Sequence, residues 1–62
     1  MKESAAKKLR NQAGFIKDQM IALVTRLEDF EFYGDAEELE AIIEKYSEFL
    51  RDVNKQIEDN IE

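Results

Sequence analysis

The sequence predicts an all-α fold, a helical hairpin that dimerises into a four-helix bundle. Two stretches, one in each half of the chain, carry apolar residues at alternating steps of three and four, the spacing of a helix that packs on other helices. One turn signal lies between them, and the chain has no Pro and only two Gly. With 44% apolar and 39% charged residues, the composition is typical of coiled-coil-like proteins rather than disordered ones.

Self-association is predicted from the length of the chain. With 62 residues, one domain formed by a single two-helix hairpin cannot close a core, and chains of this size commonly depend on disulfides, metals or oligomerisation. The chain has no Cys and no His, so disulfides and the commonest metal ligand are excluded. A two-fold homodimer is the simplest closed assembly.

The first helix is expected over about residues 4–30, with Ser4 as its N-cap. Its apolar seam continues back to Ala6 and forward to Phe30. The central seam residues follow at steps of 4, 3, 4, 3 and 4: Leu9, Ala13, Ile16, Met20, Leu23 and Leu27. Gly14 interrupts this helix, at a cost of about 1 kcal/mol relative to Ala. Two explanations for this Gly remain open: a partner approaches the backbone closely there, or the position is exposed and tolerates Gly.

A turn is expected over residues 31–35, because Gly34 is a typical residue at the end of a helix. Asp35 followed by Glu38 is an N-cap signature for a second helix. Phe32 and Tyr33, which fall in this turn, are expected to cover the end of a bundle rather than to bind a ligand.

The second helix is expected over about residues 36–58. Its seam repeats the period of the first: Leu39, Ile43, Tyr46, Leu50, Val53 and Ile57. Ile42 and Phe49 widen the apolar surface on one side, which favours a bundle over a two-stranded coiled coil. Two long helices joined by a short turn form an antiparallel hairpin.

Several classes of function are not favoured. The longest apolar run, Met20 to Val24, is far shorter than the roughly 20 residues that span a bilayer, and residues 1–10 lack an apolar leader, so we expect a cytoplasmic protein. No Gly-rich phosphate loop occurs, and no His is present to activate a nucleophile. We therefore expect neither an enzyme nor a cofactor or small-molecule substrate. The carboxylates of the second helix lack His partners and are interpreted as a solvated acidic face rather than a metal site: Glu37, Glu40, Glu44, Glu48 and Asp52.

Charge differs strongly between the two halves of the chain. Met1 to Leu27 carry six Lys and Arg against two Asp and Glu, a net charge of +4, whereas Glu28 to Glu62 carry three against thirteen, a net charge of −10. Such asymmetry is typical of a polyanion-binding surface on one side, although two solvated faces without a partner give the same pattern. An acidic second helix would repel a polyanion and leave the first helix available.

A second pattern is superposed on the first helix. Asn11, Phe15, Gln19 and Arg26 follow at steps of 4, 4 and 7, so they form one row beside the apolar seam. An exposed aromatic ring among these amides, with Arg26 and Lys17 nearby, is suited to packing on a nucleic acid whose phosphates the cations bind. The alternative is that Phe15 fills a groove between helices at the edge of a bundle.

The first helix resembles that of the Rop (Rom) family of small plasmid-encoded RNA-binding proteins, through residues 11–19, NQAGFIKDQ, and 23–27, LVTRL. The resemblance implies an antiparallel four-helix bundle of two hairpins that binds the kissing complex of two complementary stem-loop RNAs and lowers plasmid copy number. The family binds RNA through its paired first helices. The matching residues here are Asn11, Phe15, Gln19 and Arg26, and Lys7 matches a basic position that contacts phosphate.

Over the second half of the chain the resemblance is one of pattern only, with a longer connection between the helices than in the family. The same sequence also fits a protein-interaction module, such as an adaptor, chaperone or inhibitor that holds a partner helix. Residues 47–51 have a faint similarity to the motif of small two-helix aspartyl-phosphate phosphatases. Arg51 stands where those enzymes need an acid, which does not favour that activity.

Overall fold

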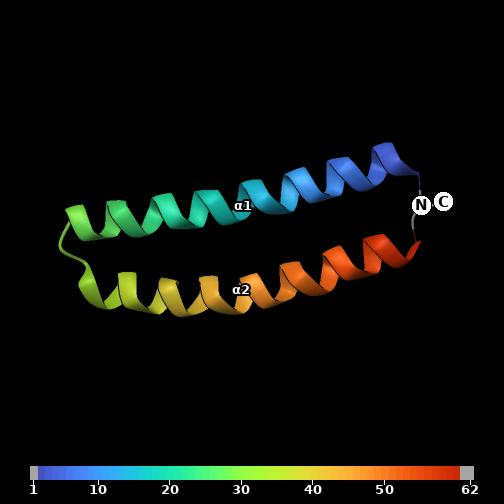
Figure 1. Cartoon of the computed structure of the whole chain (residues 1–62). Coiled ribbons are helices and arrows are strands. Elements are labelled where there is room, and N and C mark those ends of the chain that lie inside the picture. Colours follow the sequence, from blue (N-terminus) through green and yellow to red (C-terminus); the bar gives the residue numbers. More distant parts are fainter. Residues whose placement is uncertain (1, 61–62) are drawn as a thin grey trace.

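The computed structural model describes residues 2–60, which form two α-helices joined by a short turn. α1 spans Glu3–Asp29 and α2 spans Tyr33–Asn60. The helices run antiparallel, so the first turn of α1 and the last turn of α2 lie at the same end of the molecule (Figure 1). The predicted all-α helical hairpin is therefore confirmed.

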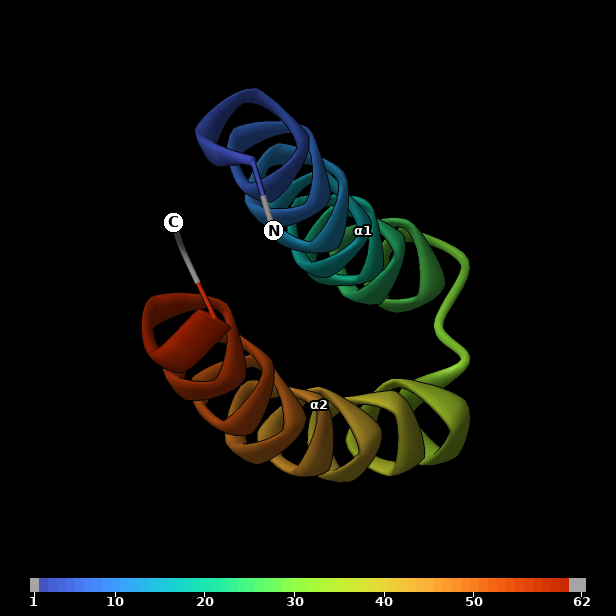
Figure 2. The same ribbon diagram turned by 90° about the vertical axis from the view of Figure 1, so that its right-hand side faces the viewer.

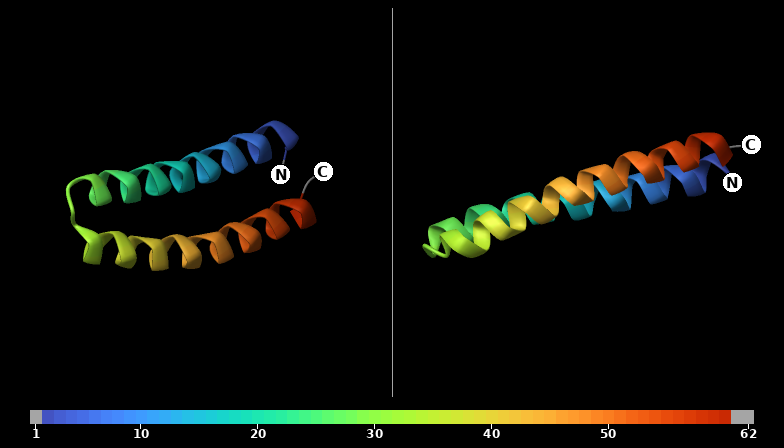
Figure 3. Two further views of the ribbon diagram at one scale, coloured as in Figure 1. Left: turned by 60° about the vertical axis from the view of Figure 1, so that its left-hand side comes forward. Right: turned by 90° about the horizontal axis from the view of Figure 1, so that it is seen from below.

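The hairpin is a single layer of two long helices. Its Cα atoms extend over 47 × 17 × 7 Å. The end-on view of Figure 2 and the view from below in Figure 3 show that the two helices cross, and the left view of Figure 3 shows α1 and α2 side by side. Within residues 2–60 each helix has only the other as a neighbour. Each therefore contributes one narrow strip of side chains to the core.

Small residues dominate the contact between the helices. The buried side chains are Ala6, Ala13 and Val24 on α1 and Ala36 and Ile57 on α2. Because three of these five are Ala, the two backbones can approach closely, but each Ala removes little apolar surface from water. The core of one hairpin is therefore thin.

The contact with α2 covers only part of the predicted seam of α1: Ala6 and Ala13 are buried, and Met20 and Leu27 are half-buried. Three seam residues at its edge remain exposed: Leu9 at 39%, Ile16 at 42% and Leu23 at 46%. Instead, Val24 is buried and Lys17 is half-buried, each one position after an exposed seam residue. The physical reason is that the apolar seam of a helix in a bundle contacts two neighbouring helices. In one hairpin α1 has α2 as its neighbour, so one side of the seam stays exposed.

A hydrogen bond joins the two helices near their middle. The Tyr46 hydroxyl donates to the backbone carbonyl oxygen of Ala13 at 2.9 Å. The Tyr46 ring also packs against Phe49 on the next turn of α2, with 5.4 Å between the ring centroids. Because Ala13 has only a methyl side chain, the tyrosine can cross to the backbone of α1. This pairing of a large and a small residue helps to fix the register of the hairpin.

α1 ends in a Schellman motif. The Glu31 N–H donates to the carbonyl of Glu28 at 2.9 Å, and the Phe32 N–H donates to the carbonyl of Leu27 at 2.8 Å, the pair of bonds that defines this motif. Glu31 adopts the left-handed conformation, with φ 65°, a position that Gly usually occupies because it has no Cβ.

The turn is therefore shorter and earlier than predicted. Gly34 and Asp35 lie within the first turn of α2, so the expectations that Gly34 ends the first helix and that Asp35 caps the second are wrong. The physical reason is that the Schellman motif already ends α1 at Asp29, and the chain can begin α2 at Tyr33.

α1 also begins earlier than predicted. Its N-cap is Lys2, in an extended conformation and without a side-chain capping hydrogen bond. Ser4, the expected N-cap, lies inside the first turn. The negative charge of Glu3 in that turn interacts favourably with the positive end of the helix dipole.

Replacing Glu31 by Gly is expected to stabilise the hairpin by about 1 kcal/mol, because Gly adopts a positive φ without the steric cost of a Cβ. Urea unfolding at one fixed protein concentration measures the change. Glu44→Gly, at an exposed interior position of α2, is the matched control and is expected to destabilise by about 1 kcal/mol. Equal losses in both variants would contradict the assigned turn.

Replacing Tyr46 by Phe is expected to destabilise the protein by about 1 kcal/mol, because it removes the hydroxyl that donates a hydrogen bond to the Ala13 carbonyl oxygen. Tyr33→Phe, at a tyrosine that is 59% exposed, is the control and is expected to leave stability nearly unchanged. Thermal unfolding of both variants provides the comparison. A Tyr46→Phe variant as stable as the control would argue against the bond between the helices.

Candidate nucleic-acid interface

A row of polar and aromatic side chains runs along the side of α1 that faces away from α2. We call Asn11, Phe15, Gln19 and Arg26 the polar row; all four are exposed, and Phe15 is 61% exposed. Ala13, which is buried, and Phe15 are two positions apart and so point about 200° apart around the helix. The Phe15 ring therefore does not fill a groove between α1 and α2.

The two predicted lysines lie in different places. Lys7 is exposed one turn before Asn11 and extends the polar row toward the start of α1. Lys17 is half-buried, and its position two residues after Phe15 places it on the side of α1 that faces α2. The structure thus brings Lys7 beside the row but does not bring Lys17 into it.

Lys8 is a further cation of this surface that the sequence interpretation did not single out. It is exposed and lies 18 residues before Arg26 on the same helix. Eighteen residues are five full turns, so the two side chains leave α1 in the same direction, about 27 Å apart along its axis. This 18-residue spacing is the feature of the sequence from which Lys8 could have been predicted. Lys8 and Arg26 therefore flank the Phe15 ring from both ends of the row.

Exposed apolar side chains form a second surface, on one side of the hairpin. We call Leu9, Ile16 and Leu23 on α1 with Ile42 and Phe49 on α2 the apolar stripe; its members recur at steps of seven within each helix and are 39–54% exposed. Leu9 and Phe49 line the same groove between the helices. The two halves of the stripe therefore share one side of the hairpin.

The polar row and the apolar stripe are adjacent on α1. Gln19 and Arg26 from the row and Leu23 from the stripe line one shallow notch together with Ala22. The other side of the hairpin is mixed: one groove is lined in part by Arg10, Asn54 and Glu58, and the other by Thr25 and Glu40 beside the apolar residues Ile21, Val24 and Ile43. The two broad sides of the hairpin thus differ in chemistry.

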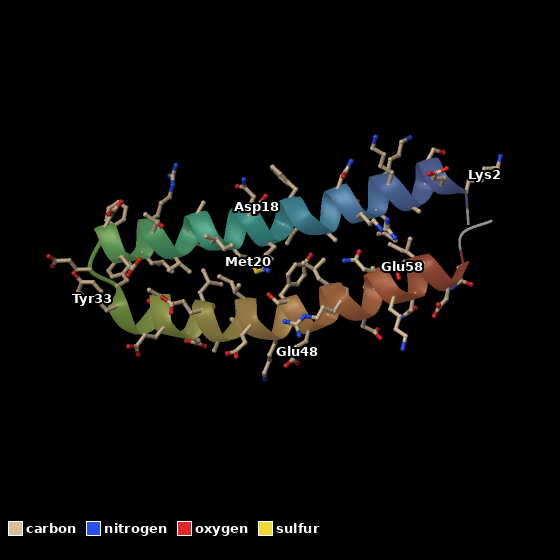
Figure 4. The ribbon with its side chains drawn as sticks, viewed as in Figure 1. Lys2, Asp18, Met20, Tyr33, Glu48 and Glu58 are labelled. Atoms are coloured by element: carbon tan, nitrogen blue, oxygen red, sulfur yellow. The ribbon has the colours of Figure 1, made fainter. Side chains whose placement is uncertain are left out.

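The outer side of α2 is acidic. Glu44, Glu48 and Asp52 lie one turn apart and are all exposed. Glu48 points away from α1, whereas Met20 on α1 points between the two helices (Figure 4). Within residues 2–60 no group of three or more His, Cys, Asp or Glu is placed to hold a metal ion. In the same part of the chain, neither helix is long and apolar enough to cross a membrane.

Comparisons with known proteins give no relative from which a function could be inferred. No protein-family model, no characterised protein and no solved structure matches this sequence or fold. The surfaces of the hairpin therefore carry the functional interpretation.

Proposed function

We propose that this protein is a homodimeric RNA-binding regulator. Two hairpins pack into a four-helix bundle, and their paired α1 helices bind a complex of two complementary stem-loop RNAs. As in the Rop family, which α1 resembles, such binding would modulate plasmid replication and copy number. The observation that carries this proposal is Phe15, an aromatic ring 61% exposed in a row of amides and cations on the side of α1 away from α2.

The area left exposed by one hairpin supports dimerisation. The chain exposes 5092 Å², whereas a compact monomer of 7.3 kDa would expose about 4,200 Å². The excess, about 900 Å², is close to the roughly 800 Å² that each partner buries in a standard protein interface. The apolar stripe is the apolar part of the surface that a second copy would cover.

The adjacency of the polar row and the apolar stripe connects dimerisation with binding. Because Gln19 and Leu23 line one notch on α1, a second hairpin packed on the stripe with its α1 beside this α1 brings the two polar rows onto one face. The outer side of α2, with Glu44, Glu48 and Asp52 exposed, would repel RNA. The polyanion is thus directed to the α1 face.

The residues of the row suit recognition by shape. The major groove of an RNA duplex is too narrow for side chains to read, so contacts fall on the backbone and on unpaired loop bases. Phe15 offers an aromatic surface for stacking, and Asn11 and Gln19 offer amides for hydrogen bonds. Lys8 and Arg26 would pair with phosphates on either side of the ring. Such binding depends weakly on sequence and strongly on salt.

The exposed apolar stripe also favours a second candidate, a protein-interaction module that holds a helix of another protein. In that case the stripe is covered by a different chain, and the polar row has no ligand. The module would be monomeric or loosely dimeric, would gain stability with its protein ligand, and would not bind RNA.

Gel-shift assays with a pair of complementary stem-loop RNAs test the proposed function. The native protein is expected to retard the paired loops more strongly than either loop alone. Phe15→Ala is expected to weaken this binding at least about fivefold, because loss of one aromatic–base stack costs about 1–3 kcal/mol.

The stability of the same variant provides the control. Phe15→Ala is expected to change the unfolding free energy by less than about 0.5 kcal/mol, as for other exposed sites. Ile57→Ala, at a side chain 1% exposed, is expected to cost about 2–5 kcal/mol. Equal retardation of all three RNAs, or none, would contradict recognition of the paired loops, and unfolding of Phe15→Ala would place the ring in a core.

The salt dependence of binding tests the assignment of Lys8. Lys8→Ala is expected to make the negative slope of log K against log salt shallower by about 1 for each copy in the dimer. The reason is that each copy loses one contact with an RNA phosphate. Lys55→Ala, an exposed lysine of α2, is the matched control and should leave the slope unchanged. Identical slopes for the two variants would remove Lys8 from the RNA surface while leaving the role of Phe15 intact.

A further inference from the structure

Three aromatic rings are exposed together at the turn of the hairpin, and two of them, Phe32 and Tyr33, are the rings expected from the sequence to cover the end of a bundle rather than to bind a ligand. Phe30 is 72% exposed, Phe32 55% and Tyr33 59%, and the rings of Phe30 and Phe32 stack with 6.2 Å between centroids and 22° between planes. Tyr33 lies at the end of the molecule farthest from Lys2 (Figure 4). Exposed clusters of large apolar side chains on a small protein usually mark a binding surface.

The backbone under these rings is held by hydrogen bonds on both sides of the turn. The Schellman bonds from Glu31 and Phe32 fix the end of α1, and the Ala36 N–H donates to the carbonyl of Phe32 at 3.0 Å at the start of α2. Rings on a fixed backbone lose little conformational freedom when they bind a partner. The turn therefore presents a largely pre-organised aromatic surface.

The surroundings of the rings are strongly negative. Between Arg26 and Lys45 the chain carries eight Asp and Glu and no Lys or Arg. Glu31 lies in the turn, and Glu28, Asp29 and Asp35 lie in the adjoining ends of α1 and α2; all four are exposed. Such a surface repels nucleic acids and anionic lipids, so it is unsuited to the ligand proposed for the polar row.

Aromatic faces and carboxylates both attract cations. A Lys or Arg placed over an aromatic ring gains from the ring quadrupole, and its charge is satisfied further by a neighbouring carboxylate. Apolar side chains beside that cation can pack on the remaining ring surface. The chemistry that complements this turn is therefore a protein segment that combines Lys or Arg with apolar residues.

We propose that the aromatic turn, formed by Phe30, Phe32 and Tyr33 with their flanking carboxylates, is a docking site for a cationic, amphipathic segment of another protein. Phe30 follows Leu23 by one further step of seven residues, about 10 Å along the helix axis, so this site borders the apolar stripe. It does not depend on the RNA-binding role of the polar row. A dimer that binds RNA on its α1 face would present this turn at the end of each hairpin.

Fluorescence anisotropy with a labelled synthetic helix of Lys and Leu tests this site, with the same helix carrying Glu in place of Lys as the control peptide. The native protein is expected to bind the Lys peptide and not the Glu peptide. Phe30→Ala combined with Tyr33→Ala is expected to weaken binding at least about tenfold, because aromatic anchors dominate such interfaces. The Phe15→Ala variant is expected to bind the Lys peptide as strongly as the native protein does.

Neutralising two carboxylates at a time distinguishes binding at the turn from general attraction of the peptide to an acidic protein. Asp29→Asn with Asp35→Asn is expected to weaken peptide binding several-fold, whereas the matched change on α2, Glu48→Gln with Asp52→Asn, is expected to have little effect. Equal losses from the two pairs would show non-specific charge attraction and overturn the site. Unchanged binding by the aromatic double variant would overturn it as well.

The mass of the aromatic double variant decides whether a second copy of the chain covers the rings. Sedimentation equilibrium is expected to give the same mass for this variant as for the native protein. If the variant alone falls to a single chain, the rings belong to the contact between copies and the docking site is rejected. RNA retardation by the same variant is expected to be unchanged, so the two proposals can fail separately.

Discussion

Each helix of the hairpin packs against a single neighbour, and the rest of the structure depends on this limit. Contact between two helices buries one narrow strip of each, here mostly Ala on α1 with Ile57 and Ala36 on α2. The hydrogen bond from Tyr46 to the Ala13 carbonyl holds this strip in register. Because both helices are amphipathic over a wider arc than one neighbour can cover, the apolar stripe is left at the surface. A second hairpin is the simplest means of burying it.

The remaining surfaces of the hairpin are divided by charge. The polar row and its flanking cations occupy the outer side of α1, whereas the outer side of α2 is acidic, and the turn combines carboxylates with three aromatic rings. The proposed functions give each surface a different class of partner: RNA at α1, another hairpin at the stripe and a cationic protein segment at the turn. The same separation would orient a polyanion on the molecule, because only one side attracts it.

Periodicity in the sequence was sufficient to predict two antiparallel helices. It placed Phe15 outside the three-and-four repeat but left open whether the ring is exposed or fills a groove between helices. The strip of α1 that contacts α2 was not predictable, because a bundle seam serves two neighbours and the pattern does not assign Ile16 or Val24 to either. The predicted turn is too late in the chain because Gly34 is a residue type that commonly ends a helix. Glu31, which adopts the left-handed conformation that ends α1, is not a residue type that indicates such a position. Lys17 was grouped with the polar row by nearness in sequence, although its angle around the helix turns it toward α2.

Sedimentation equilibrium of the native protein, beside the Ile16→Glu variant, tests most directly whether a second copy covers the apolar stripe. Ile16 is 42% exposed in one hairpin, so a Glu there remains solvated in a single chain but would be buried without a partner in the bundle. We expect the native protein to have twice the chain mass of 7.3 kDa and the variant to fall to the mass of one chain with reduced helicity, because one hairpin has a thin core. A native protein at the mass of one chain, or a variant that remains dimeric, would contradict the account.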